Sequence, residues 1–217
     1  MARFDSAQRI LILEAAIPVF AEQGLEGAAI REVGQAAGVN SAMLYYYFEN
    51  KQTLFVEAVR FVMRGLLDHL AQHRRAFDDG RQRLTFLVDG LFDYYGRHPE
   101  RLRLMAVALV LHAEVLSRII RDFASQKVLL PLDILQEGVR CGQLKPSQPA
   151  QVWWSILGMS LFSLMARDVT QHIDPSQLPL PLPDSTQTRR QIIDLLCSGL
   201  ASRQEPREPR KRKRATI

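Results

Sequence analysis

Residues 31 to 51 have the sequence Arg-Glu-Val-Gly-Gln-Ala-Ala-Gly-Val-Asn-Ser-Ala-Met-Leu-Tyr-Tyr-Tyr-Phe-Glu-Asn-Lys, and this stretch decides the fold. Glycine takes a positive φ at the C-terminal cap of a helix without a Cβ clash, so Gly38 ends a first helix. Asn40 or Ser41 can then accept a hydrogen bond from the free amides that begin a second helix. Two short helices joined by a glycine turn have the shape of a helix-turn-helix that reads DNA.

The apolar spacing divides each of these helices into an inner and an outer face. In the first helix, Ile30, Val33 and Ala37 form an inward stripe. In the second, Leu44 and Phe48 stand four residues apart and face the core. The residues left on the outer side of the second helix are Ser41, Ala42, Tyr45 and Tyr46, with Tyr47 at its edge.

Three consecutive tyrosines on so short a helix form either a contact surface for a partner or half-buried packing. They follow small residues that let the start of the helix sit deep in a groove, and Lys51 lies just beyond them. Their hydroxyls suit phosphate oxygens or base edges. We therefore expect them to contact DNA, with packing as the alternative.

Residues from about Arg9 to Phe55 resemble the N-terminal domain of the TetR/AcrR family of bacterial transcriptional regulators. The resemblance rests on Ala15-Ala16 and Phe20 before Gly24, then Ile30-Arg31-Glu32-Val33, Ala37-Gly38-Val39, and Leu44-Tyr45-Tyr46-Tyr47-Phe48 followed by Lys51. It implies that Ser41, Ala42 and Met43 approach bases or backbone in the major groove. It further implies that Tyr45, Tyr46 and Tyr47 contact phosphates and bases, and that Arg31 and Lys51 hold the DNA backbone.

Two departures from the family pattern stand out. Ala28-Ala29 replaces hydroxyl residues that often cap the next helix and bind phosphate, so that anchor is missing. Pro18 falls inside the first helix, where proline removes a backbone donor and costs about 3 kcal/mol in an undisturbed interior. We expect a kink near Ala15.

Length and composition fit this interpretation, although they would not have produced it alone. The chain has 217 residues, of which 47% are hydrophobic and 24% charged, as in a soluble protein with one large or two modest domains. We expect a helix-turn-helix domain over residues 1–50, a helical effector-binding and dimerisation domain over 51–202, and a disordered basic tail over 203–217. The segment from Asp174 to Asp184 contains four prolines and is expected to be extended.

The net positive charge comes from the tail. The formal net charge is +5, and residues 203–217 carry seven Arg and Lys against two Glu, so the rest of the chain is neutral. The first sixty residues hold five Arg and Lys against seven Asp and Glu. Phosphate contacts must therefore come from locally placed cations, hydroxyls and helix N-termini. The tail is either solvated without a fixed partner or attracts DNA non-specifically.

The cysteines and the apolar segments indicate the cellular compartment of the protein. Cys141 and Cys197 lie far apart in helical, apolar contexts, as expected for reduced thiols in a cytoplasm. Val152 to Ala166 is a run of fifteen uncharged residues, short of the roughly 20 that span a bilayer. We expect a cytoplasmic protein without a membrane partner, in which this run is a buried helix.

The remainder of the chain has helical periodicity throughout. The stripe from Phe55 to Leu70 extends a long connecting helix away from the helix-turn-helix. Further helices are expected over 84–95, over 102–116, and over 119–139 with an interruption at Pro131. The helices around 150–170 and 186–202 are the natural pair for a homodimer, and the family resemblance implies that they form a four-helix bundle across a two-fold axis.

The resemblance also implies a small-molecule pocket among the middle helices, although no ligand residue transfers from it. Candidates for its lining, each of which could equally be plain core, are Phe86, Phe92, Tyr95, Met105, His112, Phe123 and Trp154.

No pattern indicates an enzyme, a metal site or a cofactor. The sequence has no phosphate-cradling glycine loop, no Gly-x-Ser-x-Gly elbow and no paired-cysteine metal signature. His69 and His73 share a helix face but lack a third ligand and a general-base glutamate, which favours a solvated face.

The sequence therefore predicts an all-α, homodimeric transcriptional repressor that an effector releases from a palindromic operator in double-stranded DNA. The alternatives are an activator or ligand-independent DNA-binding protein of the same fold, and a helical protein-interaction module.

Overall fold

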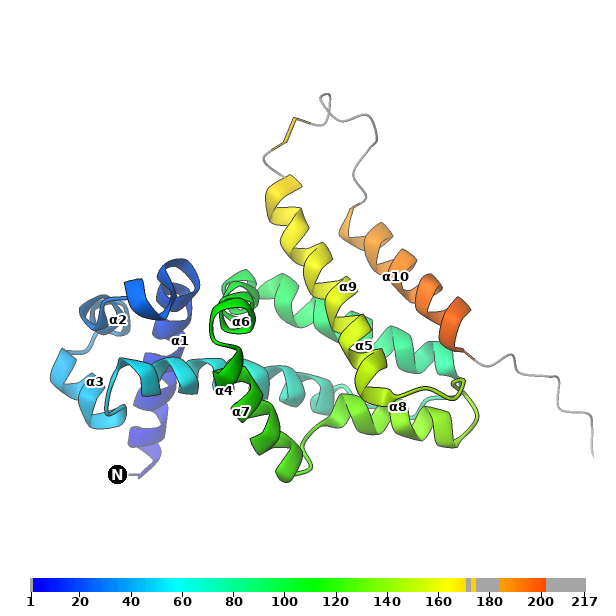
Figure 1. The fold of residues 1–217 in the computed structure, drawn as a ribbon. Helices are drawn as coiled ribbons and strands as arrows, with labels where there is room; N and C mark the ends of the chain where they lie inside the picture. The colour runs from blue at the N-terminus through cyan, green and yellow to red at the C-terminus, as the bar shows by residue number, and fades with distance from the viewer. Residues whose placement is uncertain (1, 171–172, 175–183, 202–217) are drawn as a thin grey trace, which may run out of the picture.

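The computed structural model describes residues 2–170, 173–174 and 184–201. Within these residues the chain forms ten α-helices and no strand, which confirms the all-α fold (Figure 1). The helices are α1 (Ala2–Gly27), α2 (Ile30–Ala37), α3 (Ser41–Tyr47), α4 (Lys51–Gln72), α5 (Gly80–Arg97), α6 (Pro99–Leu111), α7 (Ala113–Ser125), α8 (Leu130–Arg140), α9 (Pro149–Thr170) and α10 (Ser185–Leu200). The basic tail and the proline-rich residues 175–183 lie outside the described residues.

Helices α1 to α3 form a unit at one end of the molecule, on the left in Figure 1. The start of α4 completes the core of this unit. There the rings of Phe20 on α1 and Phe55 on α4 meet edge to face at a centroid distance of 5.2 Å. Leu44 and Phe48 are buried in the same core, as predicted. The unit is therefore joined to the rest of the chain by shared packing and not by a loose linker.

The break in α1 lies at Gly24 rather than near Ala15, where the kink was expected. Gly24 has φ 68° and ψ −178°, while the helix continues through Pro18. A positive φ costs glycine no Cβ clash, so the change of direction is concentrated at that residue. The loss of one donor at Pro18 is tolerated inside the helix.

The long helix α4 connects the N-terminal unit to the remaining helices, as predicted. The side chain of Asn50 caps its start by accepting hydrogen bonds from the Thr53 amide at 2.8 Å and the Thr53 hydroxyl at 3.1 Å. The predicted stripe from Phe55 to Leu70 is buried along its length. Helix α4 packs against α1, α5 and α6, so it touches both parts of the molecule.

The boundaries of the middle helices differ from those predicted. The helix expected over 102–116 is broken at His112, whose ring packs on Phe55 at a centroid distance of 4.9 Å. The interruption expected at Pro131 lies instead at residues 126–129, where Lys127 has φ 55°. Pro131 stands in the first turn of α8, where its missing N–H has no helical partner to lose.

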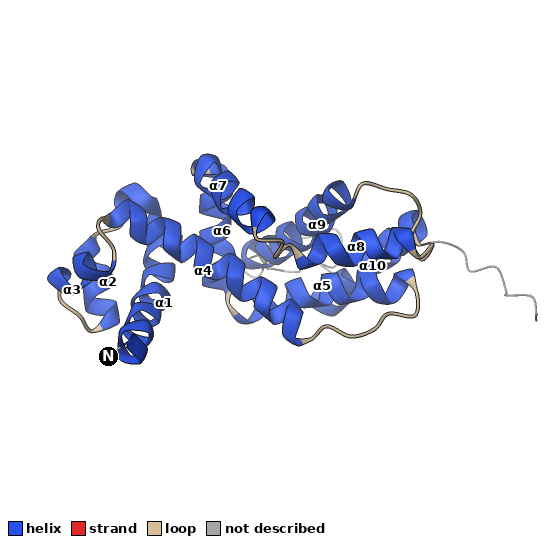
Figure 2. Cartoon of the chain, turned by 90° about the horizontal axis from the view of Figure 1, so that it is seen from below, coloured by secondary structure: helices blue, strands red, loops and turns tan. Residues whose placement is uncertain are grey.

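Helices α9 and α10 pack side by side against α5 (Figures 1 and 2). Arg189 on α10 binds Asp93 at 2.9 Å and Asp89 at 3.4 Å, both on α5. At the other end of α10, the Lys145 amide donates to the Leu200 carbonyl at 2.8 Å. Among the described residues, none of the helices has the length and apolar character needed to cross a membrane.

Candidate nucleic-acid interface

The turn between α2 and α3 is built on two glycines. Gly38 adopts the left-handed conformation with φ 67° and ψ 29°, and its N–H donates to the Gln35 carbonyl at 3.2 Å. The next N–H, of Val39, donates to the Gly34 carbonyl at 2.9 Å. A Cβ at Gly34 would lie 2.9 Å from the Val39 carbonyl oxygen and 3.3 Å from Leu44 Cδ1. Gly34 therefore permits the close approach that sets the angle between the two helices.

Asn40 is the residue that caps α3. Its side-chain oxygen accepts a hydrogen bond from the Met43 amide at 2.9 Å, which resolves the earlier choice between Asn40 and Ser41. At the far end the Phe48 amide donates to the Leu44 carbonyl at 2.8 Å. With seven residues, α3 is too short to be stable alone, so this cap and the burial of Leu44 and Phe48 hold it in place.

The outer face of α3 carries the residues that the sequence placed there. Ala42, Met43, Tyr45 and Tyr46 are exposed, and 77% of the Tyr46 surface is open to solvent. Tyr47 is half-buried, and its ring meets that of Tyr46 edge to face at 5.1 Å. The alternative of half-buried packing thus describes Tyr47, while Tyr45 and Tyr46 point into solvent.

The two predicted cations of the site have different surroundings. Arg31 is exposed on α2 and forms no ion pair within the described residues. Lys51 is half-buried, and its Nζ donates to the Glu26 carbonyl at 3.0 Å and the Ala28 carbonyl at 3.2 Å. Lys51 therefore fastens the end of α1 to the start of α4. No sequence pattern indicated this role, because its partners are backbone carbonyls more than twenty residues away.

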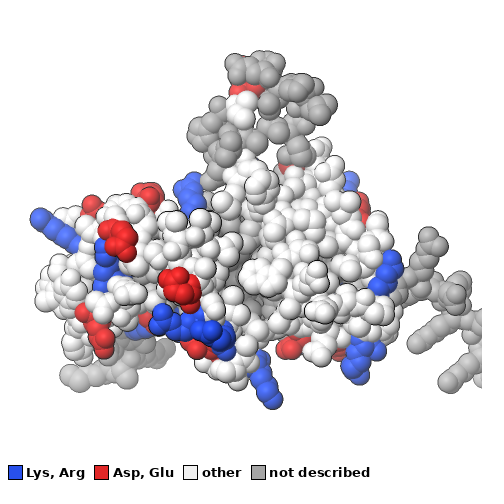
Figure 3. Space-filling view, in the orientation of Figure 1, with Lys and Arg blue, Asp and Glu red and all other residues white. Residues whose placement is uncertain are grey.

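Other cations of the N-terminal unit are engaged in internal contacts. Arg9 binds Glu57 at 2.6 Å, and its guanidinium lies 5.1 Å from the centroid of the Phe48 ring. Arg60 binds Asp122 at 2.7 Å. Both charge signs are visible at this end of the molecule (Figure 3). The surface around α3 therefore has no uniform positive field.

The start of α2 has no side-chain cap, and Glu32 is the acidic residue of its first turn. Ala29 stands at its N-cap and supplies no side-chain hydrogen bond. Unpaired amides and the positive end of the helix dipole attract negative groups such as phosphate. Replacing the hydroxyl residue by alanine thus removes one phosphate ligand and leaves the first amides of α2 without a side-chain cap.

The seven candidate effector residues differ in how deeply they are buried. Phe86, Phe92, Tyr95 and Phe123 are buried in the core. Met105 and His112 are half-buried, and half of the Trp154 surface is exposed on α9. Burial raises the pKa of the Tyr95 phenol far above its ordinary value, so this hydroxyl is neutral.

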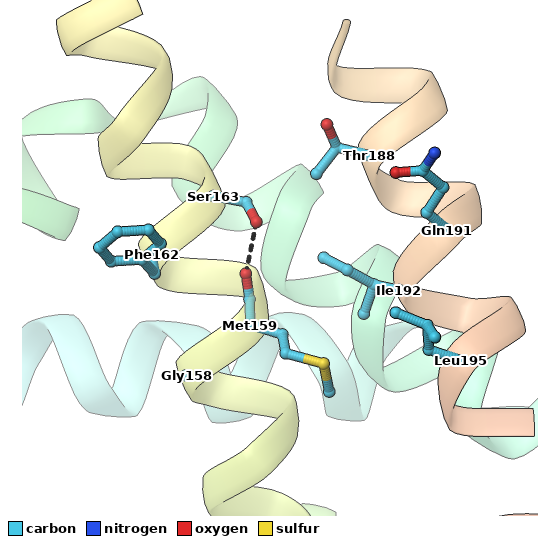
Figure 4. A pocket seen from close by; sticks show the side chains of 8 residues that line it. All are labelled: Gly158, Met159, Phe162, Ser163, Thr188, Gln191, Ile192 and Leu195. Carbon is cyan, nitrogen blue, oxygen red and sulfur yellow. Dashed lines mark hydrogen bonds between the residues drawn. The ribbon is translucent and has the colours of Figure 1, made fainter. Parts of the chain in front are cut away.

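An open groove of about 410 Å³ lies between α9 and α10 (Figure 4). None of the seven candidate residues lines it. Its lining consists of Gly158, Met159, Phe162, Ser163, Thr188, Gln191, Ile192 and Leu195. The Ser163 hydroxyl donates to the Met159 carbonyl at 2.6 Å, and Phe162 is 74% exposed at the rim. Helical periodicity could not reveal this groove, because it depends on the spacing between two helices.

The paired histidines of α4 stack on each other at a ring-centroid distance of 4.5 Å. Burial, together with the neighbouring His73, lowers the pKa of His69. Among the described residues, no group of three or more potential ligands is placed to hold a metal ion.

Two family models match the chain. The model of bacterial regulatory proteins of the tetR family matches residues 12–58, and that of the tetracyclin repressor-like C-terminal domain matches residues 81–195. The first match covers the helix-turn-helix, and the second covers more than half of the chain. Together they span both parts of the fold described above.

Individual relatives agree with these models. The transcriptional repressor NicS of Pseudomonas putida is 32% identical over 137 residues, and the chain spans 62% of its length. The transcriptional activator FasR of Mycolicibacterium smegmatis is 31% identical over 94 residues, 43% of each chain. The structure of FadR from Bacillus subtilis in complex with stearoyl-CoA superposes with a TM-score of 0.70 at 17% identity, covering 88% of this chain and 98% of FadR. On these matches, the protein belongs to the tetR family of bacterial regulatory proteins.

Proposed function

We propose that this protein is a sequence-specific transcriptional regulator, a homodimeric repressor that a small-molecule effector releases from a palindromic operator. The observation that carries the proposal is the solvent-facing side of α3, where Ala42, Met43, Tyr45 and Tyr46 project from a capped helix at the end of the molecule. A helix held in this way can enter the major groove of DNA. Residues 1–50 then form the DNA-binding domain and residues 51–202 the effector and dimer domain.

Each residue of the proposed interface has a task that fits its surroundings. Ser41 and Ala42 lie in the first turn of α3 and enter the groove without steric bulk, and the longer Met43 side chain beside them approaches the bases or the backbone. Tyr45 and Tyr46 reach base edges or phosphates, with Tyr47 supporting them from the side. Arg31 binds the DNA backbone. Lys51 has one N–H left for a phosphate after its two internal hydrogen bonds.

The homodimer is proposed to form through α9 and α10. Phe162, Leu195, Trp154 and Met165 expose large apolar surfaces on these helices. Contiguous apolar surface of this kind marks an interaction site, and the groove gives it a shape that a second copy can enter. A two-fold dimer presents two copies of α3 to successive major grooves of a palindrome.

Release by an effector needs two dimer states with different affinities for the ligand. Such coupling typically amounts to about 1 to 3 kcal/mol. The name of NicS supports repression, and the stearoyl-CoA held by FadR supports a small-molecule effector, here among the buried side chains of the middle helices. The name of FasR keeps activation as the second candidate. We place the protein in the cytoplasm, where its DNA is found.

The experiment that tests the proposal is selection of genomic DNA fragments by the purified protein, followed by binding titrations with wild type, Tyr45→Ala and Tyr45→Phe. A palindromic consensus should emerge, with affinity lost in Tyr45→Ala. Retention of affinity in Tyr45→Phe would assign the contact to the ring, and its loss would assign the contact to the hydroxyl. Binding without a consensus that is unchanged in Tyr45→Ala would contradict the proposal.

A further inference from the structure

The junction between α6 and α7 projects an apolar surface into solvent. We call this surface the α6–α7 corner and define it as Leu109, Val110, Leu111 and Ala113, all of which are exposed. Val110 is 76% exposed and Leu111 65%. Successive residues on a helix are rotated by about 100°, so three in a row span more than half of its circumference. The last turn of α6 is therefore exposed on most of its sides. An exposed apolar run of this length is unusual unless it has a function.

The junction between α6 and α7 lies on the same side of the molecule as helix α9 (Figures 1 and 2). Helix α6 packs against α9. In Figure 1 the end of α6 and the length of α9 both face the viewer, and in Figure 2 both lie toward the upper edge. The surface over α9 in this orientation carries few charged side chains (Figure 3). One partner can therefore cover α9 and the corner together.

We propose that the α6–α7 corner is a second part of the homodimer interface, covered by the other copy of this chain. The inference rests on the proposed homodimer and extends it beyond α9 and α10. A second copy fits because α6 packs against α9, whose exposed Trp154, Phe162 and Met165 belong to the proposed dimer face, so a two-fold partner that covers α9 also reaches the end of α6. A projecting apolar knob that enters a hollow on the partner is also the arrangement found at energetically dominant interface positions.

The position of the corner gives this contact a mechanical consequence. Between Leu111 and Ala113, His112 turns inward and packs on Phe55 at 4.9 Å, and Phe55 packs on Phe20 at 5.2 Å. Phe20 belongs to α1, against which α6 is also packed. A partner that holds the corner thereby holds the DNA-binding unit through two ring contacts. The spacing of the two α3 helices is then set at the junction of the domains as well as in the helical bundle.

The test compares two exposed leucines changed in the same way. Leu111→Asp alters the corner, and Leu11→Asp alters a leucine of α1 that is 56% exposed. Leu195→Asp in the groove serves as the reference for the bundle. Dimer dissociation constants are measured by sedimentation velocity without DNA, and circular dichroism checks the fold. We expect Leu111→Asp to raise the constant about tenfold or more and Leu11→Asp to leave it within about twofold.

A second measurement covers the case in which Leu111→Asp fails to fold. Hydrogen exchange of the wild type is followed from concentrations below to above the dimer dissociation constant. Amides of residues 109–116 should gain protection over the same range as those of α9. If Leu195→Asp weakens the dimer while Leu111→Asp does not, or if residues 109–116 gain no protection, the inference is wrong and the homodimer stands. A wild type that remains monomeric would overturn both.

Discussion

At the scale of single residues, Gly34 lets α2 and α3 pack closely against each other because it has no side chain. A methyl group there would lie 2.9 Å from the Val39 carbonyl oxygen, which belongs to the backbone and cannot turn away. We expect Gly34→Ala to lower the free energy of unfolding by about 1 to 3 kcal/mol, as overpacking does. Urea denaturation measures the change.

Gly96 provides the matched control. It lies in α5, and an added Cβ would meet no atom within 4 Å. Alanine has a higher helix propensity than glycine, so Gly96→Ala should stabilise the protein by up to about 1 kcal/mol. Equal effects of the two substitutions would contradict the steric role of Gly34.

Lys51 and Arg31 should separate folding from DNA binding. Lys51→Met removes two hydrogen bonds that join α4 to the end of α1 and the residue after it, so it should cost about 1 to 2 kcal/mol of stability in the absence of DNA. Arg31→Met should leave stability unchanged, because Arg31 is exposed and forms no ion pair in the described residues. Thermal melts of both variants without DNA measure this difference.

Arg31 should also contribute to the salt dependence of DNA binding. Each phosphate neutralised contributes about −0.9 to the slope of log K against log salt, so losing Arg31 from both subunits should make the slope shallower by about 2. Operator titrations at several salt concentrations give the slopes. An unchanged slope in Arg31→Met would remove Arg31 from the interface.

At the scale of elements, Arg189 of α10 is shared between two carboxylates of α5, Asp89 and Asp93. Burial raises the pKa of Asp89, and Arg189 lowers it to a smaller extent. The folded protein therefore binds a proton at Asp89 at a pH where the unfolded chain has released it. The contribution of Asp89 to stability thus falls as pH rises from the ordinary aspartate range through the raised pKa.

Asparagine substitutions at the two carboxylates should have opposite consequences. Asp93→Asn removes the 2.9 Å partner of Arg189 and should cost about 0.5 to 1 kcal/mol at neutral pH. Asp89→Asn removes the carboxylate that burial disfavours, so it should gain stability relative to wild type as pH rises from about 4 to 7. Thermal melts across this pH range measure the stability of Asp89→Asn relative to wild type. A gain in stability that shrinks as pH rises would contradict the raised pKa of Asp89.

The elements also show where prediction from sequence succeeds and where it ends. Gly38, Leu44 and Phe48 act locally, so their spacing was enough to predict α2, α3 and the outer face of α3. The break at His112 depends on the ring of Phe55 in another helix, and the partners of Lys51 are carbonyls of α1. Such contacts arise only when distant segments meet, as does the groove between α9 and α10. The DNA and effector contacts themselves remain predictions.

At the scale of the whole molecule, stability should depend on concentration if two copies associate. A dimer that dissociates on unfolding gains stability by mass action, so the Tm of the wild type should rise with protein concentration. Phe162→Asp places a charge on a residue that is 74% exposed at the rim of the groove. Its Tm should become independent of concentration without loss of helix content, as measured by calorimetry and circular dichroism. A concentration-dependent Tm in this variant would place the dimer contact elsewhere.

The choice of tyrosine on α3 has a consequence for conformational entropy. Tyr45 and Tyr46 each have two side-chain torsions, whereas lysine and arginine lose about 2 kcal/mol of rotamer freedom when they are immobilised. A reading face of stiff rings set on a capped helix gives up little freedom when it meets DNA. The protein should therefore still discriminate between DNA sequences at salt concentrations that weaken binding by an interface made mainly of flexible cations.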